Sequence, residues 1–138
     1  MDGSVVFWSC KKQSGLSLST MKAEFIAASQ AVRELLGMKG LFDELKLNVI
    51  KPMPMWMDSQ AAIKQIESEK STSSAKHVGI KFKFICNYAK DGIVAPRFVK
   101  SQDMMADILT KSLPAPRMEE LRAMFGLKTT QAETEEEY

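Results

Sequence analysis

The sequence is poor in the residues that build zinc and other thiolate sites. Its 138 residues include two cysteines and one histidine. Cys10 and Cys86 stand far apart, and neither has a second cysteine or histidine at the spacing that a zinc site requires. The sequence therefore argues against a structural zinc site. It favours a reduced, intracellular protein of the cytoplasm or nucleus.

Long apolar runs are also absent. No stretch reaches the roughly 20 apolar residues that a membrane-spanning helix needs. The first eight residues, MDGSVVFW, have neither the basic start nor the apolar centre of a signal peptide. We expect no signal peptide and no contact with a membrane.

The chain has no large excess of charge of either sign, because its net charge is +2. Four of its 17 acidic residues lie in the last ten positions, so residues 1–128 carry 19 basic and 13 acidic residues, or +6. A mildly basic body is compatible with a nucleic-acid surface. We predict one domain over residues 1–127 and a disordered acidic tail over residues 128–138.

The apolar pattern predicts short strands that alternate with helices, which is typical of the α/β class. We expect a helix to start after Ser19 or Thr20. Gly37 and Gly40 weaken its second half, so we expect the helix to end or bend before residues 41–45. Pro96 would confine the last strand to a sheet edge. The other expected elements are strands at residues 4–9, 55–57 and 93–99, helices at residues 59–66, 80–88 and 116–125, a turn at Asp91 and Gly92, and a short helix capped by Asp103 that contains Asp107.

Three acidic residues, Glu24, Asp58 and Asp107, lie among apolar neighbours in three separate segments. Charge is costly to bury without compensation, and hard oxygen ligands suit divalent cations. Two such cations about 4 Å apart can activate a water and stabilise the leaving oxygen of a phosphodiester. The alternative is that the three acids are unrelated: a helix-surface glutamate, a strand-end aspartate and an aspartate in a short helix.

Several short stretches match the sequence pattern of one protein family, in the same order and at the same spacing. They are residues 8–13 (WSCKKQ), 18–20 (LST), 23–28 (AEFIAA), 31–34 (AVRE), 58–60 (DSQ), 75–78 (AKHV) and 106–114 (ADILTKSLP), followed by Arg117. From residue 7 to residue 127 the chain resembles the ribonuclease H domain at the end of copia-type LTR retrotransposon polyproteins.

The resemblance implies a ribonuclease H-like fold, in which helices flank a mixed sheet. It implies that Glu24, Asp58 and Asp107 correspond to the second, third and fourth acids of the family's metal-binding set. The implied activity is hydrolysis of the RNA strand of an RNA–DNA hybrid with two Mg²⁺ ions, or with Mn²⁺.

The family's first acid, an aspartate, and its first two strands precede the segment that matches residues 4–9, so we expect this chain to be a truncated domain that lacks them. In the family's sheet order their loss leaves residues 5–8 without a neighbour, and backbone groups unpaired. Activity would then be impaired or lost unless an upstream reverse transcriptase segment or another chain supplies the acid. The alternatives are a non-catalytic module that binds nucleic acid or protein, with self-association through an open sheet edge, and a gene fragment without a folded product.

Basic residues near the matching stretches are candidates for contact with the hybrid. Lys11, Lys12, Lys76 and His77 could meet phosphates, although His77 fits a structural role equally well. Trp8 and Trp56 are interpreted as core residues rather than base-stacking platforms.

Overall fold

The computed structural model describes residues 5–12, 20–68 and 79–127 and is mixed α/β. It divides into two compact units, each described by itself. Unit 1 comprises Met1–Lys12 and Met105–Tyr138, and unit 2 comprises Gln13–Met104. The expected division into residues 1–127 and a tail stays a prediction, and residues 128–138 lie outside the described part.

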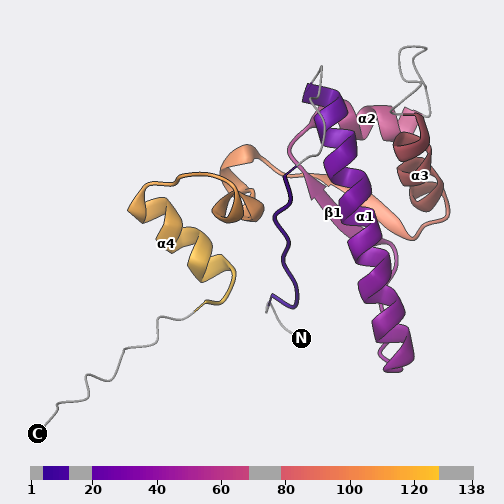
Figure 1. Cartoon of the computed structure of the whole chain (residues 1–138), viewed down its shortest axis with the longest axis horizontal. Helices are drawn as coiled ribbons and strands as arrows, with labels where there is room; N and C mark the ends of the chain where they lie inside the picture. The colour runs from indigo at the N-terminus through magenta and orange to yellow at the C-terminus, as the bar shows by residue number, and fades with distance from the viewer. Residues whose placement is uncertain (1–4, 13–19, 69–78, 128–138) are drawn as a thin grey trace, which may run out of the picture. The chain divides into compact units, whose positions relative to one another are not determined.

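Unit 2 packs three helices against a small parallel sheet (Figure 1). Its order agrees with the sequence prediction, since a strand that ends before Asp58, a helix after Ser59 and a turn at Gly92 are all present. Its elements are α1 (Thr20–Glu44), β1 (Met53–Met57), α2 (Gln60–Ser68), α3 (Gly79–Lys90), β2 (Val94–Phe98) and the 3₁₀ helix η1 (Ser101–Asp103).

Helix α1 buries one stripe of its surface, at Phe25, Ala28 and Val32, as the spacing of its apolar residues predicts. Of the two expected alternatives, an end before residues 41–45 was wrong, because the helix continues through both glycines to Glu44. The other, a bend at this point, stays a prediction. A helical glycine costs only about 1 kcal/mol relative to alanine. Packing of Leu35 and Leu36 against the core and an ion pair between Lys39 and Asp43 favour the continued helix.

The sheet pairs β1 with β2 in parallel, with Met53 beside Val94 and Met57 beside Phe98. The N–H of Met53 donates to the Ile93 carbonyl at 2.8 Å, and the N–H of Val99 donates to the Met57 carbonyl at 2.9 Å. In this register Pro96 lies where an N–H would point away from β1, so the missing donor costs no hydrogen bond between the strands. The predicted edge position of this strand is confirmed.

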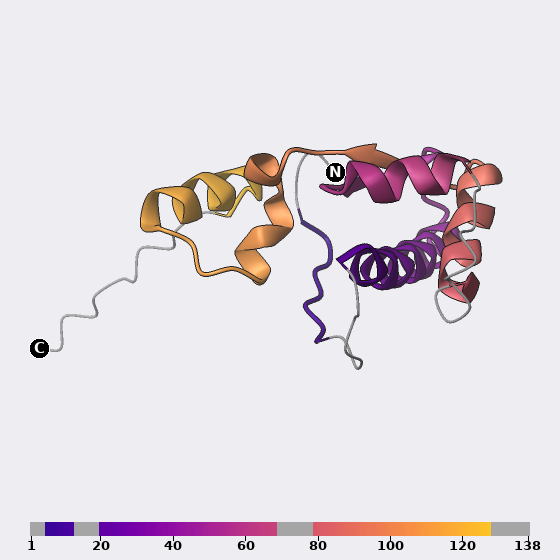
Figure 2. The ribbon, with the colours of Figure 1, turned by 90° about the horizontal axis from the view of Figure 1, so that it is seen from above.

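In the described part of unit 2, helices cover one face of the sheet and leave the other face exposed. Met53, Met55 and Met57 are buried, and the alternate residues of β1 are exposed. The buried methionines pack in one cluster with residues of all three helices. Figure 2 shows the arrangement of these helices: α1 is seen close to its axis, with α2 and α3 beside it. Trp56 is 59% exposed, so its interpretation as a core residue was wrong.

The core of unit 2 is centred between α1 and α3. The rings of Phe25 and Phe82 meet edge to face, with centroids 5.0 Å apart. Val32 and Ile85 are fully buried, and Val94 of β2 is 1% exposed. The apolar pattern that predicts a helix near residues 80–88 thus also supplies the side chains that close the core.

Unit 1 contains the 3₁₀ helix η2 (Met105–Leu109) and α4 (Ala115–Met124). The predicted last helix is confirmed, and Gly126, with φ +70°, follows its end. The predicted short helix around Asp107 is also present, but Asp103 belongs to η1 and does not cap it.

The strand predicted at residues 4–9 was wrong, since the described residues 5–9 belong to no strand. Val6 and Phe7 are 50% exposed and Trp8 is 67% exposed, so Trp8 also is not a core residue. A strand needs a hydrogen-bonding neighbour, and in the described residues β1 and β2 pair only with each other.

Candidate functional site

Asp58 directly follows β1, at the carboxyl end of a parallel strand, where open α/β sheets place their ligand sites. Its side chain is half-buried. Its Oδ2 accepts a hydrogen bond from the Ser101 hydroxyl at 3.3 Å. The position of Asp58 is therefore defined by the end of one strand and by the segment that follows the other.

Glu24 lies in the second turn of α1, one residue before the buried Phe25. Its side chain is half-buried. Burial raises the pKa of the Glu24 carboxyl above its ordinary value of 4.5, and the negative charge of Asp58 raises this pKa further. The fold thus brings two carboxylates, 34 residues apart in the sequence, close enough for one to affect the ionisation of the other.

Asp107 lies in unit 1, within η2. The Lys111 ammonium, one helical turn ahead, donates a hydrogen bond to the Asp107 carboxylate and forms an ion pair with it. The distance from Lys111 Nζ to Asp107 Oδ2 is 2.9 Å. The prediction that Asp107 joins Glu24 and Asp58 in one metal site stays a prediction. Among the described residues of each unit, there is no group of three or more His, Cys, Asp or Glu side chains that could hold a metal ion.

The basic residues expected to contact nucleic acid are only partly described. Lys11 and Lys12 are exposed in unit 1, and Lys76 and His77 lie outside the described residues. On α3, Lys83 is exposed and the adjacent Phe82 is buried, so Lys83 lies on the solvated face of a packed helix.

Ser101 was not predicted from the sequence, although a signal for it exists. Parallel strands end at the same edge of a sheet, and the register places Met57 beside Phe98. The residues that follow the two strands, Asp58 and the segment from Val99 to Ser101, must therefore come close together. A hydroxyl among them is a natural donor to the carboxylate.

Sequence comparison finds similarity to transposon proteins. It is 28% identical over 125 residues to a retrovirus-related Pol polyprotein from transposon TNT 1-94 of Nicotiana tabacum, which covers 91% of this chain. It is 27% identical over 122 residues, 88% of its length, to the RE1 polyprotein of Arabidopsis thaliana, and 30% identical over 108 residues, 78% of its length, to the RE2 polyprotein of the same plant.

The chain is similar to one region of retrotransposon Pol polyproteins. It spans 9%, 8% and 7% of the lengths of these three relatives. No family model and no solved structure matches it. None of the helices in the described parts of the chain has the length and apolar character needed to cross a bilayer.

The raised pKa of Glu24 predicts a specific dependence of stability on pH. Between pH 4.5 and the higher pKa of the folded state, the unfolded chain has lost a proton that the folded chain keeps. The free energy of unfolding should therefore fall as the pH rises through this interval. Glu24→Gln should remove this decrease and be more stable than the wild type at pH 7.

Urea unfolding at a series of pH values from 4 to 7 measures this effect. Glu44→Gln, at an exposed position of the same helix, is the matched control and should keep the wild-type slope. If the free energy of unfolding of Glu24→Gln fell with rising pH as steeply as that of the wild type, Glu24 would not be the group responsible.

Proposed function

We propose that this chain carries a ribonuclease H-type site that hydrolyses the RNA strand of RNA–DNA hybrids. The observation that carries the proposal is the position of Asp58 at the carboxyl end of β1, near enough to Glu24 of α1 that its charge adds to burial in raising the pKa of the Glu24 carboxyl. Two partly buried carboxylates that lie close together repel each other, and a cation bound between them removes this repulsion. The likeness to Pol polyproteins supports a role in retrotransposon nucleic-acid chemistry.

The two carboxylates suit Mg²⁺ or Mn²⁺, because both cations prefer hard oxygen ligands. Glu24 and Asp58 would hold the ion, and the Ser101 hydroxyl would orient Asp58 through its hydrogen bond. When bound, such an ion supplies stabilisation of the negative charge that develops on the phosphodiester. Asp107, released from Lys111, would be a further ligand, as would a carboxylate from a neighbouring polyprotein segment.

Contact with the hybrid would come from exposed cations. Lys11 and Lys12, and in the undescribed segment Lys76 and His77, would meet phosphates of either strand. These contacts carry no sequence information, so cleavage should depend on the hybrid form of the substrate and on salt concentration.

The test is turnover of a hybrid with a labelled RNA strand. We expect slow cleavage of that strand with Mg²⁺ or Mn²⁺, because the family's first acid is absent from the chain, no cleavage when a chelator removes the cation, and no cleavage of the corresponding DNA duplex. Absence of cleavage with both cations, for a chain that unfolds cooperatively, would reject the nuclease.

A second candidate is a module that binds nucleic acid without catalysis. Trp56 and Arg97 are partners in the sheet register, and partners project from the same face. Both are exposed, so an aromatic ring and a guanidinium lie next to each other on the uncovered face of the sheet. This pair suits base stacking together with a phosphate contact. Retained binding without cleavage, weakened by Trp56→Ala, would favour this candidate.

A further inference from the structure

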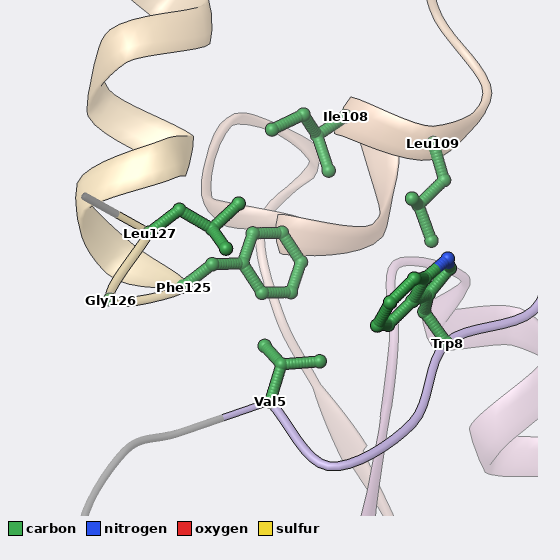
Figure 3. A pocket seen from close by; sticks show the side chains of 7 residues that line it. All are labelled: Val5, Trp8, Ile108, Leu109, Phe125, Gly126 and Leu127. Atoms are coloured by element: carbon green, nitrogen blue, oxygen red, sulfur yellow. The ribbon is translucent and has the colours of Figure 1, made fainter. Parts of the chain in front are cut away.

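An apolar hollow of about 350 Å³ lies in unit 1. Figure 3 shows Val5 and Trp8 on one side of it, with the indole of Trp8 facing Leu109 of η2. Phe125 and Leu127, after the end of α4, lie on the other side. None of the described residues that line it is charged, so it has no group that would select one class of ligand.

A second hollow, beside β2 in unit 2, has both apolar and charged walls. It is bounded by the ends of α2 and α3, by the turn at Gly92 and by β2. Its volume is about 390 Å³, within the range of roughly 300–1,000 Å³ that small-molecule sites occupy. All of its lining residues belong to unit 2, so the hollow is a feature of one compact unit.

The floor of the hollow beside β2 is formed by core residues. Ile66 of α2 is 3% exposed and Val94 of β2 is 1% exposed. The thiol of Cys86 donates a weak hydrogen bond to the Ile66 carbonyl at 3.8 Å, which connects α3 to the end of α2. Because these residues pack in the core cluster, they give the hollow a fixed apolar surface. Such a surface suits the flat face of a nucleobase.

Three charged side chains also line this hollow. Arg97 of β2 and Lys90 at the end of α3 are cations, and Glu67 near the end of α2 is an anion. In the described part of the chain, the Arg97 guanidinium takes part in no hydrogen bond or ion pair. Helix α3 adds to the positive potential, because it also carries Lys81 and Lys83 and no acid. A guanidinium binds phosphate through two parallel hydrogen bonds, and a nearby ammonium adds a second charge.

We propose that the hollow beside β2 binds a ribonucleotide. Its phosphate lies between Arg97 and Lys90, and its base lies on the apolar floor. A ribose hydroxyl donates to the Glu67 carboxylate, as ribose hydroxyls do to acidic residues in other nucleotide sites. Inorganic phosphate alone would leave the floor and Glu67 without a partner. Binding of this kind requires neither hydrolysis nor stacking on Trp56, so it goes beyond both candidate functions.

Titration of the isotope-labelled full chain with AMP, followed by NMR, tests this site. We expect saturable shifts of the amide signals of Ala89, Gly92 and Ala95, which line the hollow, with a dissociation constant roughly in the submillimolar range. Adenosine lacks the phosphate and should bind at least about tenfold more weakly, since hydrogen bonds to charged groups are lost. Dideoxyadenosine monophosphate lacks both ribose hydroxyls and should bind about fivefold more weakly.

Single substitutions test each contact. Arg97→Gln should weaken AMP binding at least about tenfold, whereas Arg33→Gln, at an exposed position of α1 outside the hollow, is the matched control and should leave it unchanged. Glu67→Ala should bring the affinities for AMP and for its dideoxy form to within about twofold of each other. Trp56→Ala should not affect AMP binding, which separates this site from the exposed face of the sheet.

An absence of saturable shifts with millimolar AMP would overturn the proposal. So would shifts centred on Trp56, equal affinities for adenosine and AMP, or an Arg97→Gln variant that binds AMP as the wild type does. A single-stranded oligoadenylate RNA distinguishes the two sources of a ribonucleotide. Tighter binding of this RNA than of AMP at the same amide signals would identify an RNA strand, and equal binding a free nucleotide. Each of these results is independent of hybrid cleavage.

Discussion

Ile85→Ala is expected to lower the free energy of unfolding by about 2–5 kcal/mol, the range for large-to-small changes in a packed core. Ile85 is fully buried in α3 and belongs to the cluster that joins α1, α3 and the sheet. Truncation removes apolar contact and leaves a cavity that the surrounding core residues fill only in part. Because small domains are stable by only about 5–15 kcal/mol, much of the stability would be lost.

Ile80→Ala is the matched control, since it makes the same change in the same helix. Ile80 is 81% exposed. Its replacement should change the free energy of unfolding by no more than about 0.5 kcal/mol. Urea unfolding followed by circular dichroism measures both variants. Equal destabilisation by the two changes would show that α3 does not face the core as described.

Asp58→Asn is expected to lower the rate of hybrid cleavage by about a hundredfold or more. The amide keeps the shape of the side chain and can still accept from the Ser101 hydroxyl, but it removes the negative charge that the proposed cation requires. A hundredfold loss corresponds to about 2.7 kcal/mol of transition-state stabilisation. The fold should be unchanged, so a lower cleavage rate would reflect an effect on the hydrolysis step and not unfolding of the protein.

Asp43→Asn provides the comparison for this variant. Asp43 is exposed on α1, where it pairs with Lys39, and it should not affect cleavage. Both proteins should be measured with the same hybrid and the same Mg²⁺ concentration, after their circular dichroism has been matched to the wild type. Cleavage by Asp58→Asn at the wild-type rate would remove Asp58 from the site.

The elements that could be predicted from the sequence have local causes. A helical stripe through Phe25 and Val32, a short strand before Asp58 and a glycine after the last helix depend on residues within a few positions. The same holds for the candidate carboxylates, because strand-end and helix positions are local properties. Their mutual influence was expected, and for Glu24 and Asp58 the raised pKa of Glu24 agrees with it.

The features that could not be predicted depend on contacts between distant parts of the chain. Residues 5–9 have strand-forming side chains, but the described structure offers them no neighbour. Trp56 lies in a predicted strand, yet its exposure depends on whether anything covers that face of the sheet. Ser101 becomes relevant to Asp58 only after two strands have paired in register.

By itself, the sequence determined the order of the helices and of the two paired strands, the acids that are candidates for a cation site, and the likeness to retrotransposon polyproteins. The tertiary structure decided which strands pair, which tryptophans stay exposed and which carboxylates interact. The physical reason is the range of the forces. Propensity, capping and turn chemistry act over a few residues, whereas strand pairing, burial and the coupling of charges require distant segments to come together.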